Sequence, residues 1–119
     1  MKFPFCLFKR QRGVQFEALA RHFLECQGYS LITQNFTGWQ GEIDLIMTHG
    51  NQLAFIEVRY RESLRFGSPL DSIDYAKQQR IIATAEVFFK RYPSYRSYHY
   101  RFDAVLIGPD YLHWLKNAF

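Results

Sequence analysis

The chain has 119 residues, of which 48% are hydrophobic, and this suits one domain built around a single core. Its formal net charge of +4 is compatible with a polyanionic partner. The two cysteines, Cys6 and Cys26, form neither a disulfide framework nor a CxxC zinc site, so we expect a reduced, cytoplasmic setting. No stretch approaches membrane-spanning length, and the first residues lack the order of a signal peptide. We expect a flexible N-terminal arm over residues 1–12 and a single domain over residues 13–119.

Hydrophobic periodicity and turn residues divide this domain into helices and strands. Gly28 follows a helical pattern as a C′ glycine, Gly50–Asn51 suits a two-residue hairpin loop, and Pro93 ends a second helix. The elements expected in chain order are a helix from Val14 to Gln27, a strand from Tyr29 to Phe36, a hairpin of Glu42–Thr48 and Gln52–Arg61, a helix from Asp71 or Ser72 to about Arg91, a strand from Tyr98 to Ile107 and a short edge strand from Tyr111 to Leu115. A helix between the third and fourth strands makes that pair parallel, so we predict an α/β fold with a mixed sheet flanked by helices.

The hairpin carries acidic residues inside apolar strands. With Gly50–Asn51 as the loop, the register sets Asp44 directly across from Glu57 and Glu42 across from Arg59. Two opposed carboxylates are destabilising unless a cation, a proton or solvent lies between them. Carboxylate oxygens suit Mg²⁺, so Asp44 and Glu57 are a candidate metal site for phosphodiester chemistry. The alternative is a solvent-facing strand with a Glu42–Arg59 surface pair, and for Glu42 alone we favour this alternative.

Both predicted helices direct polar residues towards the same place. Lys77 and Gln78 continue the apolar stripe of the second helix, so they should face the sheet, where they can bind a phosphate or orient water. Their alternative is to extend past the end of the sheet into solvent. Glu17 borders the stripe of the first helix and can reach the carboxylates as an outer ligand, or it can pair with Arg21 one turn away.

An ordered set of motifs runs through most of the chain, from Gly13 to Ile107. The motifs are Gly13–x–x–x–Glu17–x–x–Ala20, Gly28–Tyr29, Asn35–Phe36, Gly41–Glu42–Ile43–Asp44–Leu45–Ile46, Phe55–Ile56–Glu57–Val58–Arg59, Phe66–Gly67, Lys77–Gln78 with Arg80, and Arg101–Phe102–Asp103. Together they resemble the YraN-like family of uncharacterised bacterial proteins. That family is placed in the restriction-endonuclease-like superfamily, whose signature is PD-(D/E)xK, and its hairpin resembles that of Holliday-junction resolvases.

The resemblance implies roles for three acidic residues. Asp44 would be the signature Asp, Glu57 the signature acid, and Glu17 the acid that such nucleases often add from a helix. It also implies Mg²⁺, replaceable by Mn²⁺, as the cofactor, hydrolysis of a phosphodiester as the reaction, and nucleic acid, above all DNA, as the partner. A homodimer fits by analogy, since nucleases that act on two-fold symmetric junctions are commonly dimers.

Arg59 departs from the signature, which has Lys at this position. Arginine stays protonated and cannot act as a base, but it can bind a phosphate or stabilise negative charge. Two outcomes follow: either Lys77 supplies the missing ammonium, or this chain binds nucleic acid, or a protein, with little or no cleavage. Fold alone does not carry activity.

Other residues are candidates for contact with a substrate or for support of the site. Gln78, Arg80 and Trp39 are expected to contact the substrate, although Trp39 can equally anchor its own loop. Asp103, within the fourth strand, is a weak candidate for supporting the carboxylates.

Overall fold

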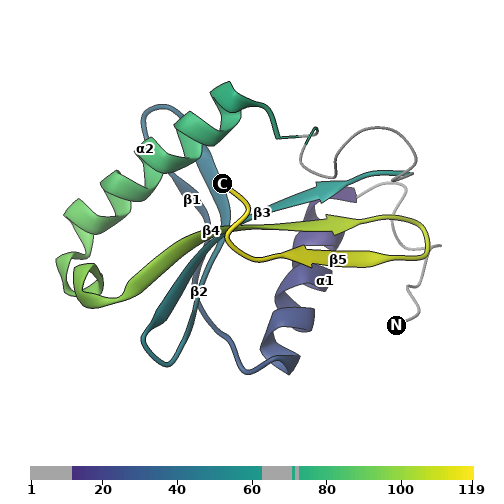
Figure 1. Cartoon of the computed structure of the whole chain (residues 1–119), viewed down its shortest axis with the longest axis horizontal. Helices are drawn as coiled ribbons and strands as arrows, with labels where there is room; N and C mark the ends of the chain where they lie inside the picture. Colours follow the sequence, from purple (N-terminus) through teal and green to yellow (C-terminus); the bar gives the residue numbers. More distant parts are fainter. Residues whose placement is uncertain (1–11, 63–70, 72) are drawn as a thin grey trace.

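The computed structural model describes residues 12–62, 71 and 73–119, which form a five-stranded sheet with one long helix on each face (Figure 1). Its elements in chain order are α1 (Arg12–Cys26), β1 (Ser30–Thr37), β2 (Glu42–His49), β3 (Gln52–Tyr60), α2 (Tyr75–Arg91), the 3₁₀ helix η3 (Pro93–Ser97), β4 (His99–Ile107) and β5 (Leu112–Leu115). Within this part of the chain, neither helix is long and apolar enough to cross a membrane.

The strands follow the order β1-β2-β3-β4-β5, and every neighbouring pair is antiparallel except β3 and β4. The parallel pair runs in unbroken register from Gln52–His99 to Tyr60–Ile107. Because α2 makes the crossover between these two strands, the predicted mixed sheet is confirmed. The arrangement is consistent with a restriction-endonuclease-like α/β fold.

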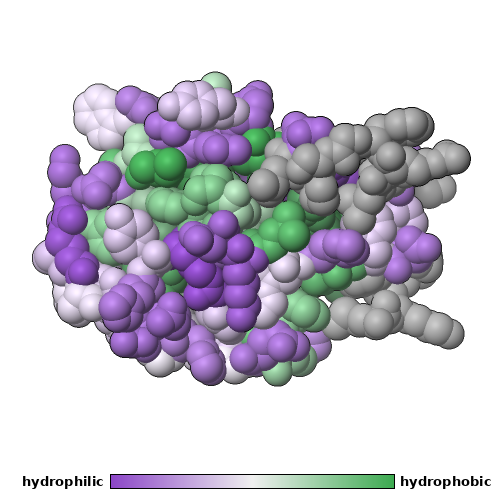
Figure 2. Space-filling view, viewed as in Figure 1, coloured by the Kyte–Doolittle hydropathy of each residue, from purple (hydrophilic) through white to green (hydrophobic). Residues whose placement is uncertain are grey.

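Two apolar clusters hold the helices to the sheet, one on each face. Phe16, Ala20 and Leu24 of α1 pack on one face, while Ile81 and Phe88 lie in the cluster beneath α2. Figure 2 shows polar side chains along the outer side of α2 and apolar ones where the helix meets the sheet. The central strands are therefore covered on both sides, which explains their nearly continuous apolar sequence.

The expected element bounds hold to within a few residues, with two corrections. The N-cap of α2 is Asp74 rather than Asp71 or Ser72, and its carboxylate Oδ1 accepts a hydrogen bond from the Lys77 backbone N–H at 2.8 Å. Ile73, just before the cap, is buried, so the chain enters the core before the helix begins. The segment Pro93–Ser97, expected as a loop, forms η3.

Two expectations concern residues that the structure does not describe. The predicted N-terminal arm, residues 1–12, lies outside the described residues apart from residue 12, where α1 begins. The Phe66–Gly67 motif also lies outside them.

Candidate metal centre

The candidate centre lies where β2 separates from β3. Paired residues run from His49–Gln52 to Leu45–Ile56, which confirms the predicted register next to the turn, but the pairing ends before the predicted Asp44–Glu57 and Glu42–Arg59 pairs. Just beyond this ladder, the carboxylate Oδ2 of Asp44 accepts a hydrogen bond from the backbone N–H of Val58 at 2.8 Å. Asp44 thus occupies the space that the next pair of backbone hydrogen bonds would fill.

The side-chain pattern of β2 explains why the strands separate there. Ile43 and Ile46 belong to the cluster under α2, whereas Leu45 and Met47 belong to the cluster under α1. Residues two apart on a regular strand share a face, so the alternation breaks between Ile43 and Leu45. Asp44 lies at the break, in an opening between the two faces of the sheet.

β1 is also irregular at this level. Gln34 pairs with Leu45 and Phe36 with Ile43, while Asn35 between them adopts a left-handed backbone with φ of 54°. Asparagine tolerates this conformation better than most residues. Its side chain hydrogen bonds with the Glu17 carboxyl group and so links α1 to the opening.

Three acidic side chains meet at this opening. Each of Glu17, Glu42 and Asp44 offers a carboxylate oxygen within 4.8 Å of the others. Arg21, the alternative partner of Glu17, instead pairs with Glu25 at 3.1 Å. Oxygen ligands from α1 and β2 therefore converge, and Arg21 does not come between them.

Glu57 meets the cluster from β3, and its side chain is only 4% exposed. Its Oε2 lies 3.1 Å from Arg59 Nε and 3.6 Å from Lys77 Nζ. No hydrogen-bond donor among the described residues reaches its Oε1, and Arg59 Nε, although within ion-pair distance, is buried without an aligned acceptor. The site thus holds one buried acceptor and one buried donor that lack hydrogen bonds.

Crowding of the acids shifts their protonation. Burial, followed by the charges of Asp44 and Glu42, raises the pKa of Glu17 to about 7. Burial and the Asp44 carboxylate also raise the pKa of Glu57 well above its usual range, with Lys77 and Arg59 opposing the shift. The two acids with raised pKa values, Glu17 and Glu57, therefore flank Asp44 from α1 and β3.

These groups border an open pocket of about 370 Å³. The lining residues are Phe16, Glu17, Asp44, Glu57, Val58, Arg59, Tyr60 and Lys77. The pocket therefore has oxygen ligands towards α1 and β2 and two basic groups towards α2, an arrangement that can hold a cation beside an anion.

The sequence also places the chain in a family. The model of the Uncharacterised protein family UPF0102 matches residues 16–107. The chain belongs to the UPF0102 family. It is 45% identical to a UPF0102 protein of Nitrosococcus oceani over 114 residues, which cover 92% of each chain. A UPF0102 protein of Enterobacter sp. (strain 638) is 42% identical over 117 residues, 98% of this chain and 89% of that one. One of Xanthomonas campestris pv. campestris is 39% identical over 113 residues, 93% of each.

Membership of UPF0102 confirms the prediction of an uncharacterised bacterial family. All four carboxylates, together with Arg59 and Lys77, fall within the residues that the family model matches. The place of the family in the restriction-endonuclease-like superfamily stays a prediction.

The residues of this UPF0102 chain that were expected to contact a substrate lie in different places. Lys77 enters the pocket, but Gln78 donates to the Ile73 carbonyl at 3.0 Å and so braces the start of α2. Arg80 is exposed one turn further along α2. Trp39, in the turn between β1 and β2, is 97% exposed, so burial does not anchor its loop.

Sequence reasoning assigned Glu42 to the wrong partner. The predicted Glu42–Arg59 pair is not among the ion pairs of the described residues, where Arg59 pairs with Glu57 and Glu42 joins the acidic cluster. The register failed because β2 and β3 separate before reaching this level. A signal was available, since Glu42 and Asp44 are two residues apart on one strand.

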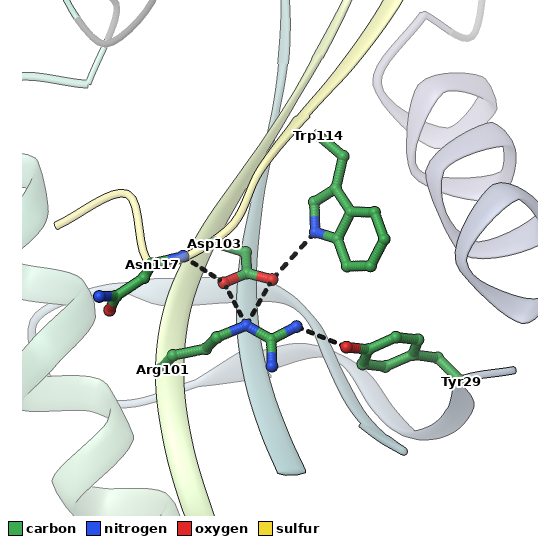
Figure 3. A network of polar contacts seen from close by, with 5 residues as sticks. All are labelled: Tyr29, Arg101, Asp103, Trp114 and Asn117. Carbon is green, nitrogen blue, oxygen red and sulfur yellow. Dashed lines mark hydrogen bonds and ion pairs between the residues drawn. The ribbon is translucent and has the colours of Figure 1, made fainter. Parts of the chain in front are cut away.

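Asp103 does not support the carboxylates. It is fully buried and forms a separate network with residues of β4, β5 and the C-terminal segment (Figure 3). Arg101 Nε lies 2.9 Å from one of its oxygens, Trp114 donates at 3.0 Å and the Asn117 backbone N–H donates at 2.9 Å. Arg101 also donates to the Tyr29 hydroxyl at 2.6 Å, so the expected role of Asp103 is replaced by a structural one.

Proposed function

We propose that this protein is a Mg²⁺-dependent endonuclease-like phosphodiesterase that acts on DNA. One observation carries the proposal: Glu17, Glu42 and Asp44 converge within 4.8 Å beside the buried Glu57, with Arg59 and Lys77 on the other side. A cluster of acids bordered by two cations can accommodate a metal ion and a phosphate together.

The donor set suits magnesium. All the candidate ligands are carboxylate oxygens, which hard cations prefer over nitrogen or sulfur. Glu57 Oε1 supports this fit, because a buried carboxylate oxygen without a donor is costly and a cation would satisfy it. When bound, Mg²⁺ would activate a water and neutralise charge on the phosphate.

The chain supplies the complementary groups for the phosphate. Arg59 Nε is a buried donor without an aligned acceptor, so a phosphate oxygen would satisfy it. Lys77 Nζ lies 3.6 Å from Glu57 and provides an ammonium group. Arg59 cannot take its place in proton transfer, because a guanidinium stays protonated. Glu17 and Glu57, with raised pKa values, are placed to take a proton near neutral pH.

Arg59 favours a second candidate function. A permanently charged guanidinium on Glu57 can hold that carboxylate away from a metal and leave a nucleic-acid-binding protein without turnover. Such a protein would bind DNA in a salt-dependent way but would not cleave it.

A cleavage assay separates the two. Labelled branched, single-stranded and duplex DNA are incubated with the protein, with and without Mg²⁺ or Mn²⁺. The proposal predicts metal-dependent cleavage that Asp44→Asn and Glu57→Gln each abolish and that Glu86→Gln, an exposed acid on α2, leaves unchanged. Salt-sensitive binding without cleavage would favour the second candidate, and neither binding nor cleavage would contradict both.

A further inference from the structure

Trp39 is the most exposed large apolar residue of the described chain. It lies in the turn between β1 and β2 and is 97% exposed. Tryptophan normally buries much of its ring, so an indole that is almost fully exposed beside a hollow leaves a large apolar face open to a ligand. The position of the ring therefore suggests a partner.

The turn that carries Trp39 is held in place on both sides. The Gly38 backbone N–H donates to the Gly41 carbonyl at 2.8 Å. A Cβ added to Gly38 would lie 3.1 Å from Thr84 Cγ2, and one added to Gly41 would lie 3.3 Å from Arg80 Cβ. The two glycines thus let the turn lie directly on α2, as Figure 1 shows. A ring presented from a packed turn loses little conformational freedom on binding.

A hollow of about 430 Å³ lies next to the ring. It is lined by Trp39, Gln40, Ala83, Thr84, Val87 and Lys90. Its apolar walls suit a flat ring, and the exposed Lys90 suits a phosphate. A nucleotide combines both features.

Basic side chains of α2 lie between this hollow and the acidic cluster. Lys77, at 3.6 Å from Glu57, stands at one end, and Lys90, in the hollow, stands at the other. The 13-residue step from Lys77 to Lys90 spans about 20 Å of helix, and at about 100° per residue it sets the two side chains about 140° apart around the axis. Arg80 is exposed, lies one turn from Lys77, and packs with its Cβ beside Gly41 of the turn that carries Trp39. Glu42 follows Trp39 by three residues, or about 10 Å of extended chain.

We infer that Trp39 stacks on an unpaired base of a DNA strand whose backbone follows Lys90, Arg80 and Lys77 to the acidic cluster. The inference rests on the proposed function and names its substrate class, a DNA with a single-stranded segment next to the bond that is cleaved. The faces of bases inside a duplex are covered by their neighbours, so the exposed ring can stack only on an unpaired or terminal base.

Binding of a labelled single-stranded oligonucleotide and of a relaxed, covalently closed circular duplex, which has neither unpaired nor terminal bases, tests this inference in EDTA without cleavage. We expect Trp39→Leu to weaken single-strand binding about tenfold and to change duplex binding little, because stacking on one base is lost. Trp39→Phe keeps a ring and should retain most of the affinity. Leucine keeps an apolar side chain but has no ring. Comparing Trp39→Leu with Trp39→Phe therefore separates stacking from general apolar contact.

Lysine variants test the path along α2. Lys90→Gln should weaken single-strand binding and lower the slope of log affinity against log salt by about one. Lys116→Gln, an exposed lysine outside the hollow, is the matched control and should change neither.

Three binding results would overturn the inference: no single-strand binding by the wild type, equal affinity for Trp39→Leu and wild type, or equal losses for single strand and duplex. Equal losses for single strand and duplex would indicate that Trp39 makes a general apolar contact rather than stacking on a base. If Trp39→Leu leaves metal-dependent cleavage of DNA unchanged, the inference is overturned and the proposed function still stands. Absence of cleavage with intact Trp39-dependent binding would instead contradict the proposed function.

Discussion

Arg59 and Lys77 approach the same oxygen of Glu57 from different elements, at 3.1 Å and 3.6 Å. They are not equivalent, since a guanidinium can bind a phosphate through two parallel N–H groups, whereas an ammonium acts as a compact point charge. Under the proposed function, Arg59 contacts the phosphate and Lys77 supplies the ammonium of the site.

Lys77→Gln should therefore lower the DNA cleavage rate by about 100-fold, the usual cost of removing one charge-stabilising donor. Arg59→Lys should stay within about tenfold of wild type, because a lysine there keeps the positive charge near Glu57. Single-turnover cleavage rates measure both. If the wild type is inactive and Arg59→Lys cleaves DNA strongly, Arg59 is the residue that silences the site.

The raised pKa of Glu17 predicts how stability depends on pH. Between about pH 5 and pH 7 the folded protein keeps a proton on Glu17 that the unfolded chain has released, so metal-free stability should fall as pH rises. Glu17→Gln should make this part of the profile shallower and leave the slope that the raised pKa of Glu57 contributes. Thermal unfolding in EDTA across pH 5 to 8 measures it, and Glu25→Gln, an exposed acid on the same helix, is the control. An unchanged slope in Glu17→Gln would contradict the assigned burial and crowding.

At the scale of the elements, the start of α2 sets the position of Lys77. Asp74 caps the helix through the Lys77 N–H, and Gln78 binds the carbonyl of Ile73. The cap therefore positions both the helix and a residue of the site.

Asp74→Ala should cost about 1 kcal/mol of unfolding free energy, because a helix N–H loses its acceptor. Asp74→Asn keeps a capping oxygen and should cost less than half as much. Urea unfolding provides the comparison. Equal effects of the two substitutions would show that the charge of Asp74, rather than its cap, matters.

The hairpin also shows what could be predicted from the sequence. Gly50–Asn51 has the chemistry of a two-residue loop, so the register near the turn was predictable and is confirmed. The separation of the strands at Asp44 was not predictable. It depends on packing against both helices and on the left-handed backbone of Asn35 in the neighbouring strand β1. The cap of α2 was misplaced since Asp71, Ser72 and Asp74 all suit the role.

For the whole molecule, the two faces of the sheet contribute different groups to one site. Glu17 comes from α1 on one face, and Lys77 from α2 on the other. The α/β class and the parallel pair followed from periodicity. The Asp103 network did not, because its members Tyr29, Trp114 and Asn117 are far from Asp103 and Arg101 in the sequence. That network fastens the end of the chain to β4, where Phe119 stacks on Phe102 with centroids 5.5 Å apart.

Asp103→Ala should cost about 3 to 5 kcal/mol of unfolding free energy, because it leaves the largely buried Arg101 without its carboxylate. Glu86→Ala, which removes the exposed partner of Arg96, is the matched control and should cost less than about 1 kcal/mol. Urea unfolding measures both. Similar values for the two would show that the Asp103 network contributes little to stability.

Metal binding tests the central claim most directly, since it requires no knowledge of the substrate. Mn²⁺ is titrated into the wild type, Asp44→Asn and Glu86→Gln, and free Mn²⁺ is followed by its paramagnetic resonance signal. The account predicts saturable binding by the wild type and Glu86→Gln that tightens from pH 6 to pH 8, as protons leave the cluster, and that Asp44→Asn loses. Equal binding by wild type and Asp44→Asn, or none by either, would contradict it.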